Sequence, residues 1–380
     1  MPGLRQTMAE PVGFVDDPIT ALDATRAVES VLEQVLDAGL RRAQEADPVF
    51  ARDVAGRVAA FVRRGGRRLR AGFTWCGWRA AGGSGDATAV LHTAAAVELV
   101  QACALIHDDL MDGSPLRRGA PAMHVDLARM HREARMSGPP ESFAAAAAVL
   151  AGDLALAWAD DLLMETALGS PYGLRLCGEW RAMRGEMVAG QYRDIHAHAA
   201  GASRVEEALS IATLKSALYT VERPLALGAS LAAADERTLE ALRSAGRCAG
   251  LAFQLRDDVL GAFGEPALTG KPVGEDLRTG KLTYLLAVAL ELAEAAGDVE
   301  AARVLAPGAA SRPDATVEEM RAALERTGAP AVVETKIASL AAAGLRHFEA
   351  TGADAGVRRE FAALVERAAG VTPGRGGEAA

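Results

Sequence analysis

The sequence predicts an all-α protein, and three observations support this: the composition, the periodicity of apolar residues and the spacing of helix breakers. The chain has 380 residues, of which 50% are hydrophobic but only 4% aromatic. Alanine and leucine, which are strong helix formers, are abundant, whereas residues typical of strands have a modest share. Apolar residues recur with the helical period, and breaks rich in glycine and proline fall at residues 65–66, 82–85, 137–140, 169–171, 264–274 and 307–313. Many helices with short connections predict a bundle, and in the core of a bundle facing helices can place side chains around a metal or a ligand.

We expect one domain, at residues 21–369. A chain of this length ordinarily suggests two domains, but no linker rich in proline, glycine or serine interrupts the middle of this one. The compositions of residues 1–20 and 370–380 are typical of disorder. Residues 137–142 are expected to form an exposed insertion.

The first acidic cluster follows a run that predicts a buried central helix. Residues 94–106 are apolar almost all round, and Asp108, Asp109 and Asp112 come soon after them. On a helix, Asp108 and Asp112 share a face and Asp109 lies beside them. Like charges at this spacing repel each other unless cations lie between them. Oxygen ligands of this kind suit Mg²⁺, which keeps several waters and is commonly shared with substrate phosphates.

A second acidic cluster, Asp257 and Asp258, follows the apolar residues 248–255. A single acidic helix end is usually a solvated face. Carboxylates next to buried runs need partners, however, and two such clusters weaken that interpretation. The sequence therefore predicts two acidic walls that close on a metal-bound diphosphate.

Basic residues occur near both clusters. A basic run alone is more often a solvated helix start than a site. Arginine nevertheless matches phosphate oxygens with its planar fork, and the pair Gly65-Gly66 lets the backbone approach a ligand closely. The basic residues concerned are Arg67, Arg70, Arg117, Arg118, Lys215, Lys271 and Lys281.

Charge, cysteine content and the N-terminal segment argue against a nucleic-acid-binding, secreted or membrane-inserted protein. The formal net charge of −9 argues against nucleic-acid binding, which needs a basic surface. The four cysteines are far apart and lack metal-binding spacing, which predicts free thiols in a reducing cytoplasm. The N-terminal segment lacks the pattern of a signal peptide, and residues 144–151 are too short a run to cross a bilayer. We expect a cytoplasmic protein without stable membrane insertion.

Six separate motifs occur in order over roughly residues 60–290: GGRRLR, QACALIHDDLMDGSPLRRGAPAMH, GQYRDI, KSALYT, FQLRDD and TGKPVGEDLRTGK. With these motifs in this order, the chain closely resembles the trans-prenyltransferase (polyprenyl diphosphate synthase) family. It implies an all-α homodimer with the isoprenoid-synthase-type helical bundle around a central active-site cavity. It also implies that the protein condenses isopentenyl diphosphate with dimethylallyl, geranyl or farnesyl diphosphate. The reaction would run by ionisation, condensation and elimination and give an all-trans polyprenyl diphosphate.

The resemblance also implies a role for each matching residue. Three Mg²⁺ ions per site would be held by Asp108, Asp109, Asp112, Asp257 and Asp258. The allylic diphosphate would be held by Arg117, Lys215, Lys271 and Lys281. Isopentenyl diphosphate would be held by Arg67, Arg70, Gln101 and Arg118. Lys215, Ser216, Tyr219 and Gln254 would be the catalytic residues around the allylic cation.

The chain departs from the family pattern at two positions. Gly261 stands where many relatives have a third aspartate on the second wall, and Arg67 stands where lysine is usual. Both changes could alter affinity or metal demand. Neither removes the predicted site.

Small residues before the first cluster favour a product of twenty carbons, geranylgeranyl diphosphate. In this family's geometry, residues upstream of the cluster lie below the reacting carbons, where bulk stops chain growth. The positions concerned are Cys103 and Ala104, one helical turn below Asp108, and Val100 farther down. Their modest size leaves room for a growing chain, and the modest size of Val97 and Val100 leaves longer products as an alternative.

Two other classes share some of these features. A class I terpene cyclase handles one diphosphate and usually carries a different metal motif on its second wall. A non-catalytic regulatory subunit of another prenyltransferase would commonly have lost aspartates that this chain keeps. His107 is expected to be structural, and Asp194, His196 and His198 are not expected to form a metal site, because residues two apart do not share a helix face.

Overall fold

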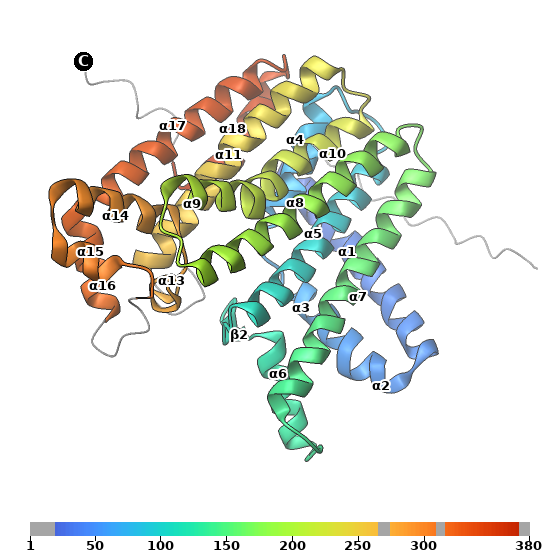
Figure 1. The fold of residues 1–380 in the computed structure, drawn as a ribbon. Coiled ribbons are helices and arrows are strands. Elements are labelled where there is room, and N and C mark those ends of the chain that lie inside the picture. The colour runs from blue at the N-terminus through green and yellow to red at the C-terminus, as the bar shows by residue number, and fades with distance from the viewer. Residues whose placement is uncertain (1–19, 265–273, 309–315, 372–380) are drawn as a thin grey trace, which may run out of the picture.

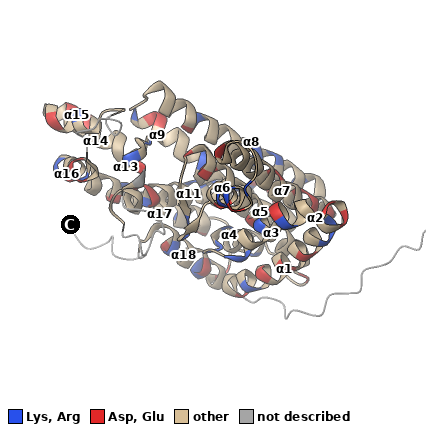
Figure 2. Cartoon of the chain, turned by 90° about the horizontal axis from the view of Figure 1, so that it is seen from below, with Lys and Arg blue, Asp and Glu red and all other residues tan. Residues whose placement is uncertain are grey.

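The computed structural model describes residues 20–264, 274–308 and 316–371. Nearly all of the described chain is helical, apart from two strands of two residues each. The prediction of an all-α bundle is therefore confirmed. Acidic and basic residues lie intermixed along the helices in the view of Figure 2.

The first half of the chain forms the central helix and its surroundings (Figure 1). The elements in order are α1 (Ala21–Ala46), α2 (Pro48–Phe50), the π-helix η1 (Ala51–Ala55), α3 (Gly56–Arg63), α4 (Leu69–Ala80), α5 (Thr88–Met111), α6 (Met123–Glu133), α7 (Pro140–Leu168) and α8 (Gly173–Ala200). Helix α5 packs against α4 and α7. Val97, Leu99 and Val100 are completely buried, as expected of a helix that is apolar all round.

The second half of the chain forms the long helix that carries the second acidic cluster and a group of short helices. Its elements are α9 (Val205–Ala212), the π-helix η2 (Thr213–Glu222), α10 (Arg223–Leu231), α11 (Glu236–Phe263), α13 (Glu275–Thr279), α14 (Tyr284–Ala296), α15 (Val299–Leu305), α16 (Val317–Thr327), α17 (Ala329–Glu349) and α18 (Ala355–Ala369). Helix α11 packs against η2 on one side and against α17 on another. These contacts fix the position of α11, which carries the second acidic cluster.

Two local features differ from the sequence-based expectation. A small hairpin, β1 (Leu116–Arg117) paired with β2 (Ala120–Pro121), follows α5. Strands of this length leave no periodic signal. Part of the predicted insertion at residues 137–142 is helical, because α7 begins at Pro140, and proline suits the first turn of a helix.

Helices α5 and α7 are long and apolar enough to cross a membrane by length and composition alone. Their mean hydropathies over the most apolar window are 1.7 and 1.6, and 72% and 44% of those windows are buried inside the bundle. The whole of α7 is much longer than the run at residues 144–151 considered above. Burial accounts for the apolar character of α5, whereas α7 keeps an apolar face exposed.

Candidate active site

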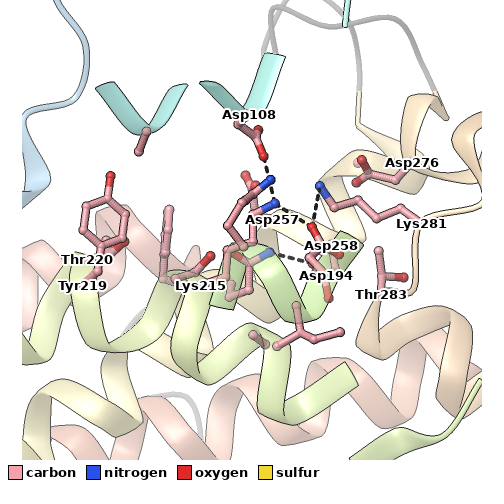
Figure 3. Close-up of a pocket in the computed structure, with 18 of the residues that line it drawn as sticks. Asp108, Asp194, Lys215, Tyr219, Thr220, Asp257, Asp258, Asp276, Lys281 and Thr283 are labelled. Atoms are coloured by element: carbon pink, nitrogen blue, oxygen red, sulfur yellow. Dashed lines mark hydrogen bonds and ion pairs between the residues drawn. The ribbon is translucent and has the colours of Figure 1, made fainter. Parts of the chain in front are cut away.

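The two acidic clusters line one cavity of about 470 Å³. Asp108 enters it from the end of α5, and Asp257 and Asp258 enter from α11 on the opposite side (Figure 3). Side chains from α4, α8, α9 and η2 complete the wall. Clusters separated by almost 150 positions in the sequence therefore meet in space, as the proposed chemistry requires.

The three aspartates of the first cluster have different environments. Asp108 faces the cavity, whereas the side chain of Asp109 is completely buried and Asp112 is the C-cap of α5. The hairpin after α5 folds Arg117 back onto this helix end, where its Nε donates to Asp109 Oδ1 at 2.9 Å. Arg117 also lies 3.3 Å from Asp108. The hairpin thus supplies positive charge where the aspartates crowd together.

Two lysines and one buried aspartate link the first wall to the rest of the site. Lys215 Nζ lies 2.8 Å from Asp108 and 2.6 Å from Asp194. Lys281 Nζ lies 3.0 Å from Asp112 and 3.4 Å from Asp194. Asp194 therefore holds both ammonium groups at the cavity, a role that the sequence analysis did not assign to it. The signal available was its place in the GQYRDI motif, four residues after Gly190.

These cations keep the first wall ionised. Burial alone would favour the protonated form of Asp108, but the charges of Lys281, Lys215 and Arg117 outweigh it and hold the pKa of Asp108 well below its usual range. Burial likewise disfavours charge on Lys281, yet the surrounding carboxylates raise the pKa of Lys281 well above its usual value. The cavity therefore has fixed charges of both signs at the end lined by Asp108 and Lys281.

A π-helix presents the residues expected near the allylic cation. Lys215, Ser216 and Tyr219 all lie on η2 and line the cavity. Helix α8 approaches η2 so closely that a Cβ at Gly190 would lie 2.3 Å from the backbone N of Lys215. Glycine is therefore required at this position, and π-helical turns are frequent at functional sites.

The two aspartates of the second wall are not equivalent. Asp257 is exposed, whereas Asp258 is only 6% exposed. Asp258 accepts hydrogen bonds from Gln254 Nε2 at 2.8 Å and from the backbone N of Tyr284 at 3.0 Å. Burial, together with the charges of Asp276 and Asp257, raises the pKa of Asp258 to about 7 in spite of those hydrogen bonds, which lower it. The second wall thus carries negative charge that is costly without a cation.

The opposite end of the cavity is basic and has unsatisfied polar atoms. Arg67, Arg70 and Gln101 line it. Arg70 donates to Thr220 Oγ1 at 2.8 Å and lies 4.3 Å above the ring of Tyr219. Within the described part of the chain, Arg70 Nε, Gln101 Oε1 and Tyr219 OH are buried without a hydrogen-bond partner. Such atoms are costly unless a ligand pairs with them.

Two basic residues of the sequence motifs, Arg68 and Arg118, do not line the cavity. Arg68 is buried in a left-handed conformation with φ 46° and pairs with Glu29 and Glu98, facing away from the cavity. Arg118 does not line the cavity; it donates to the carbonyl of Gly65, next to the cavity-lining arginines. Lys271 lies outside the described residues.

The donor set fits Mg²⁺ in its chemistry. Among the described residues, no three carboxylate, imidazole or thiol groups already converge as a complete metal-binding set. Mg²⁺ does not need such a set, because it retains waters and binds through one or two carboxylates plus substrate phosphates. Asp108 and Asp257 offer oxygen ligands from opposite walls. The raised pKa of Asp258 indicates the negative charge that a cation would neutralise.

The residues expected to set chain length lie on and behind one wall. Ala104 lines the cavity. Cys103 and Val100 are 3% and 0% exposed and lie outside the lining, in the core. His107 is turned toward α7, where its Nε2 lies 3.1 Å from the carbonyl of Val149. His196 and His198 are exposed, in contrast to Asp194.

Comparison with known proteins gives one consistent family. Residues 54–324 match the polyprenyl synthetase family. The geranylgeranyl diphosphate synthase of Mycobacterium tuberculosis is 35% identical over 256 residues, which cover 66% of this chain and 65% of that protein. The match thus spans slightly less than two thirds of that relative. The nonaprenyl diphosphate synthase of the same organism is 29% identical over 343 residues, which cover 90% of this chain and 92% of that protein.

Solved structures give the same result. The geranylgeranyl pyrophosphate synthase of Corynebacterium glutamicum, complexed with isoprenyl diphosphate and magnesium, superposes with a TM-score of 0.86 at 39% identity. The superposition covers 91% of this chain and 98% of that one.

Proposed function

The chain belongs to the polyprenyl synthetase family, and we propose that it condenses isopentenyl diphosphate with an allylic diphosphate in a Mg²⁺-dependent reaction. One observation carries the proposal: Asp108 and Asp257 face each other across a cavity that also holds Lys215 and Lys281. Carboxylates on two walls of one cavity, with ammonium groups in the same lining, can hold both a divalent cation and a diphosphate. The expected product is an all-trans polyprenyl diphosphate.

Ionisation of the allylic diphosphate places negative charge on the leaving group, which the site must stabilise. The aspartates of the two walls would hold Mg²⁺, three ions per site by the resemblance, which would supply Lewis-acid stabilisation of the leaving group. Lys215, Lys281 and Arg117 would exchange their carboxylate partners for diphosphate oxygens. All three already point at this end of the cavity, which limits the reorganisation needed when the substrate binds.

The second substrate would bind at the basic end of the cavity. Arg67 and Arg70 offer guanidinium groups to its diphosphate, and the unpaired Oε1 of Gln101 marks a polar position beside them. Tyr219 and Gln254 would line the path of the allylic cation, where a dry wall is needed so that the double bond reacts before water does. The released diphosphate would take up the proton lost in the final step.

We propose geranylgeranyl diphosphate as the product. Two observations support it: the small side chains of Ala104 and Cys103, and the geranylgeranyl diphosphate synthases among the relatives. Other relatives have names that point to farnesyl, geranylfarnesyl and nonaprenyl products. The carbon count of the product is therefore the decisive assay for this part of the proposal.

A terpene cyclase is the alternative with a related cavity. The basic end of the cavity, with Arg67 and Arg70, offers a second anion site, which favours a two-substrate condensation over a cyclase that handles one diphosphate. Incubation of pure protein with Mg²⁺, isopentenyl diphosphate and each allylic primer separates the functions. Elongation supports the proposal, a cyclic hydrocarbon supports the cyclase, and no turnover supports a regulatory subunit.

We also propose a homodimer that pairs through α7 and α8. Both helices expose large apolar side chains: Leu150, Met164 and Leu168 on α7, and Leu174, Val188 and Tyr192 on α8. Leu168 and Leu174 are 82% and 93% exposed. An apolar surface of this kind on packed, neighbouring helices is typical of a protein interface.

A further inference from the structure

Gly261 leaves space on α11 that another side chain occupies. A Cβ atom at Gly261 would lie 2.2 Å from Oδ2 and 3.2 Å from Cγ of Asp276. Cβ atoms in proteins essentially never approach non-bonded heavy atoms to less than 3.0 Å. The carboxylate of Asp276 therefore fills the place where a third aspartate of the second wall would begin.

Asp276 reaches this place from a different element. It lies on α13, a five-residue helix that packs against α11. Gly274 and Gly280 bound α13 in left-handed conformations with φ 68° and 67°, and the backbone N of Lys281 donates to the carbonyl of Asp276 at 3.0 Å. Asp276 and Lys281 consequently enter the cavity from the same side (Figure 3).

Asp276 lines the same cavity as the two aspartates of the second wall, Asp257 and Asp258. Asp258 itself is buried and engaged by Gln254 and Tyr284. Asp257 and Asp276 are thus the carboxylates of this wall that are less buried and able to meet a ligand.

We propose that Asp276 supplies the third carboxylate of the second metal-binding wall, and that Gly261 is needed to admit it. The inference rests on the proposed function, since it assigns a ligand for the divalent cation of that reaction. A competing role for Asp276 is to orient Lys281, whose charge it also influences. Loss of a metal ligand would weaken metal binding, whereas loss of a group that orients Lys281 would weaken diphosphate binding even without metal.

The test measures binding of Mn²⁺, as a spectroscopic probe of the divalent site, in the presence of inorganic diphosphate by electron paramagnetic resonance. Asp276→Asn should weaken Mn²⁺ binding at least about tenfold, the scale seen when groups that support a metal site are removed. Gly261→Ala should weaken it similarly by displacing Asp276, although alanine is the better helix former and should raise the thermal midpoint. Glu294→Gln, at an exposed acidic residue of α14, is the matched control and should bind as the unsubstituted protein does.

Relocation of the carboxylate gives the sharpest comparison. In an Asp276→Gly background, Gly261→Ala should cost nothing further, and Gly261→Asp should restore most of the lost affinity. Two results would overturn the inference: unchanged Mn²⁺ binding in Asp276→Asn, or an equal loss of diphosphate binding in the absence of metal. If Asp108→Asn still impairs Mn²⁺ binding, either result leaves the proposed function intact. If the unsubstituted protein showed no metal-dependent diphosphate binding, the proposed function would fail together with the inference.

Discussion

Lys215 Nζ lies 2.8 Å from Oδ1 of Asp108, and this ion pair joins the π-helix η2 to the end of the central helix α5. The same ammonium group lies 2.6 Å from Asp194 on α8. Three elements therefore meet at one charged group beside the cavity. The pair would have to open, at least in part, when a diphosphate takes up the lysine.

Replacement of Lys215 should impair catalysis more than it impairs folding. Lys215→Ala removes a cation from the leaving-group end of the cavity, where loss of one stabilising group typically costs about 10²–10³ in kcat. Steady-state assays with Mg²⁺ and both substrates measure this. Lys336→Ala, at an exposed lysine of α17, is the control and should leave kcat unchanged. Equal rates for the two variants would contradict the role of Lys215.

A methyl group at Gly190 should displace η2. Because the added Cβ would meet the backbone of Lys215, Gly190→Ala is expected to destabilise the protein by about 1–3 kcal/mol, the usual cost of overpacking, and to lower kcat. Gly185, also on α8, has open space at its Cβ position. Gly185→Ala should therefore stabilise by roughly 0.5–1 kcal/mol. Urea unfolding that gave the same sign for both substitutions would contradict this packing.

Bulk behind the cavity wall should shorten the product. Cys103→Phe places an aromatic ring one turn below Asp108, next to Ala104 on the cavity wall. We expect mainly farnesyl diphosphate in place of the twenty-carbon product. Mass spectrometry of the products from each primer measures the change. An unchanged product spectrum would remove Cys103 from the determinants of chain length.

The thiol of Cys103 should react slowly in the folded protein. Burial raises the pKa of Cys103 to about 12, and only the thiolate is nucleophilic. Its alkylation by iodoacetamide should therefore rise about tenfold per pH unit between pH 8 and pH 10. In urea, an ordinary thiol with a pKa of roughly 8.5 should level off within that range. Peptide mapping that showed a plateau near pH 9 for native Cys103 would contradict its burial.

Charge on the exposed apolar face should separate the protomers of the proposed dimer. Leu168→Asp combined with Leu174→Asp places carboxylates on α7 and α8, where they could not be buried without partners. Light scattering after size exclusion should show a shift from dimer to monomer. Val299→Asp, at a 79% exposed position on α15, is the control. A dimer that survived the double substitution would place the interface elsewhere.

Composition and periodicity were sufficient to predict the fold class, because alanine-rich helices and their glycine or proline breaks are local features. The convergence of two acidic clusters could also be inferred, since buried carboxylates need shared partners. Other relationships depend on packing between distant residues. The bridge from Asp194 to Lys215 and Lys281, and the filling of the space at Gly261 by Asp276, appear only when α8, η2, α11 and α13 are in contact.

The sequence also could not show which of two adjacent residues is buried. Asp108 and Asp109 are neighbours in the sequence, yet one faces the cavity and the other is enclosed with Arg117. Arg67 and Arg68 divide in the same way between the cavity and the core. On α5, a helical turn of about 100° per residue places Asp108 and Asp109 in different environments that only tertiary packing defines. Arg67 and Arg68 precede α4, and Arg68 has a left-handed backbone and pairs with Glu29 and Glu98.

The central claim is that two opposed acidic walls grip the departing diphosphate. Its most direct test is the condensation rate with Mg²⁺, isopentenyl diphosphate and an allylic diphosphate, measured for the unsubstituted protein, Asp108→Ala and Asp257→Ala. We expect elongation by the unsubstituted protein and a loss of several orders of magnitude in each variant, because either substitution removes one wall's hold on the leaving group. A rate near that of the unsubstituted protein in either variant would contradict the claim.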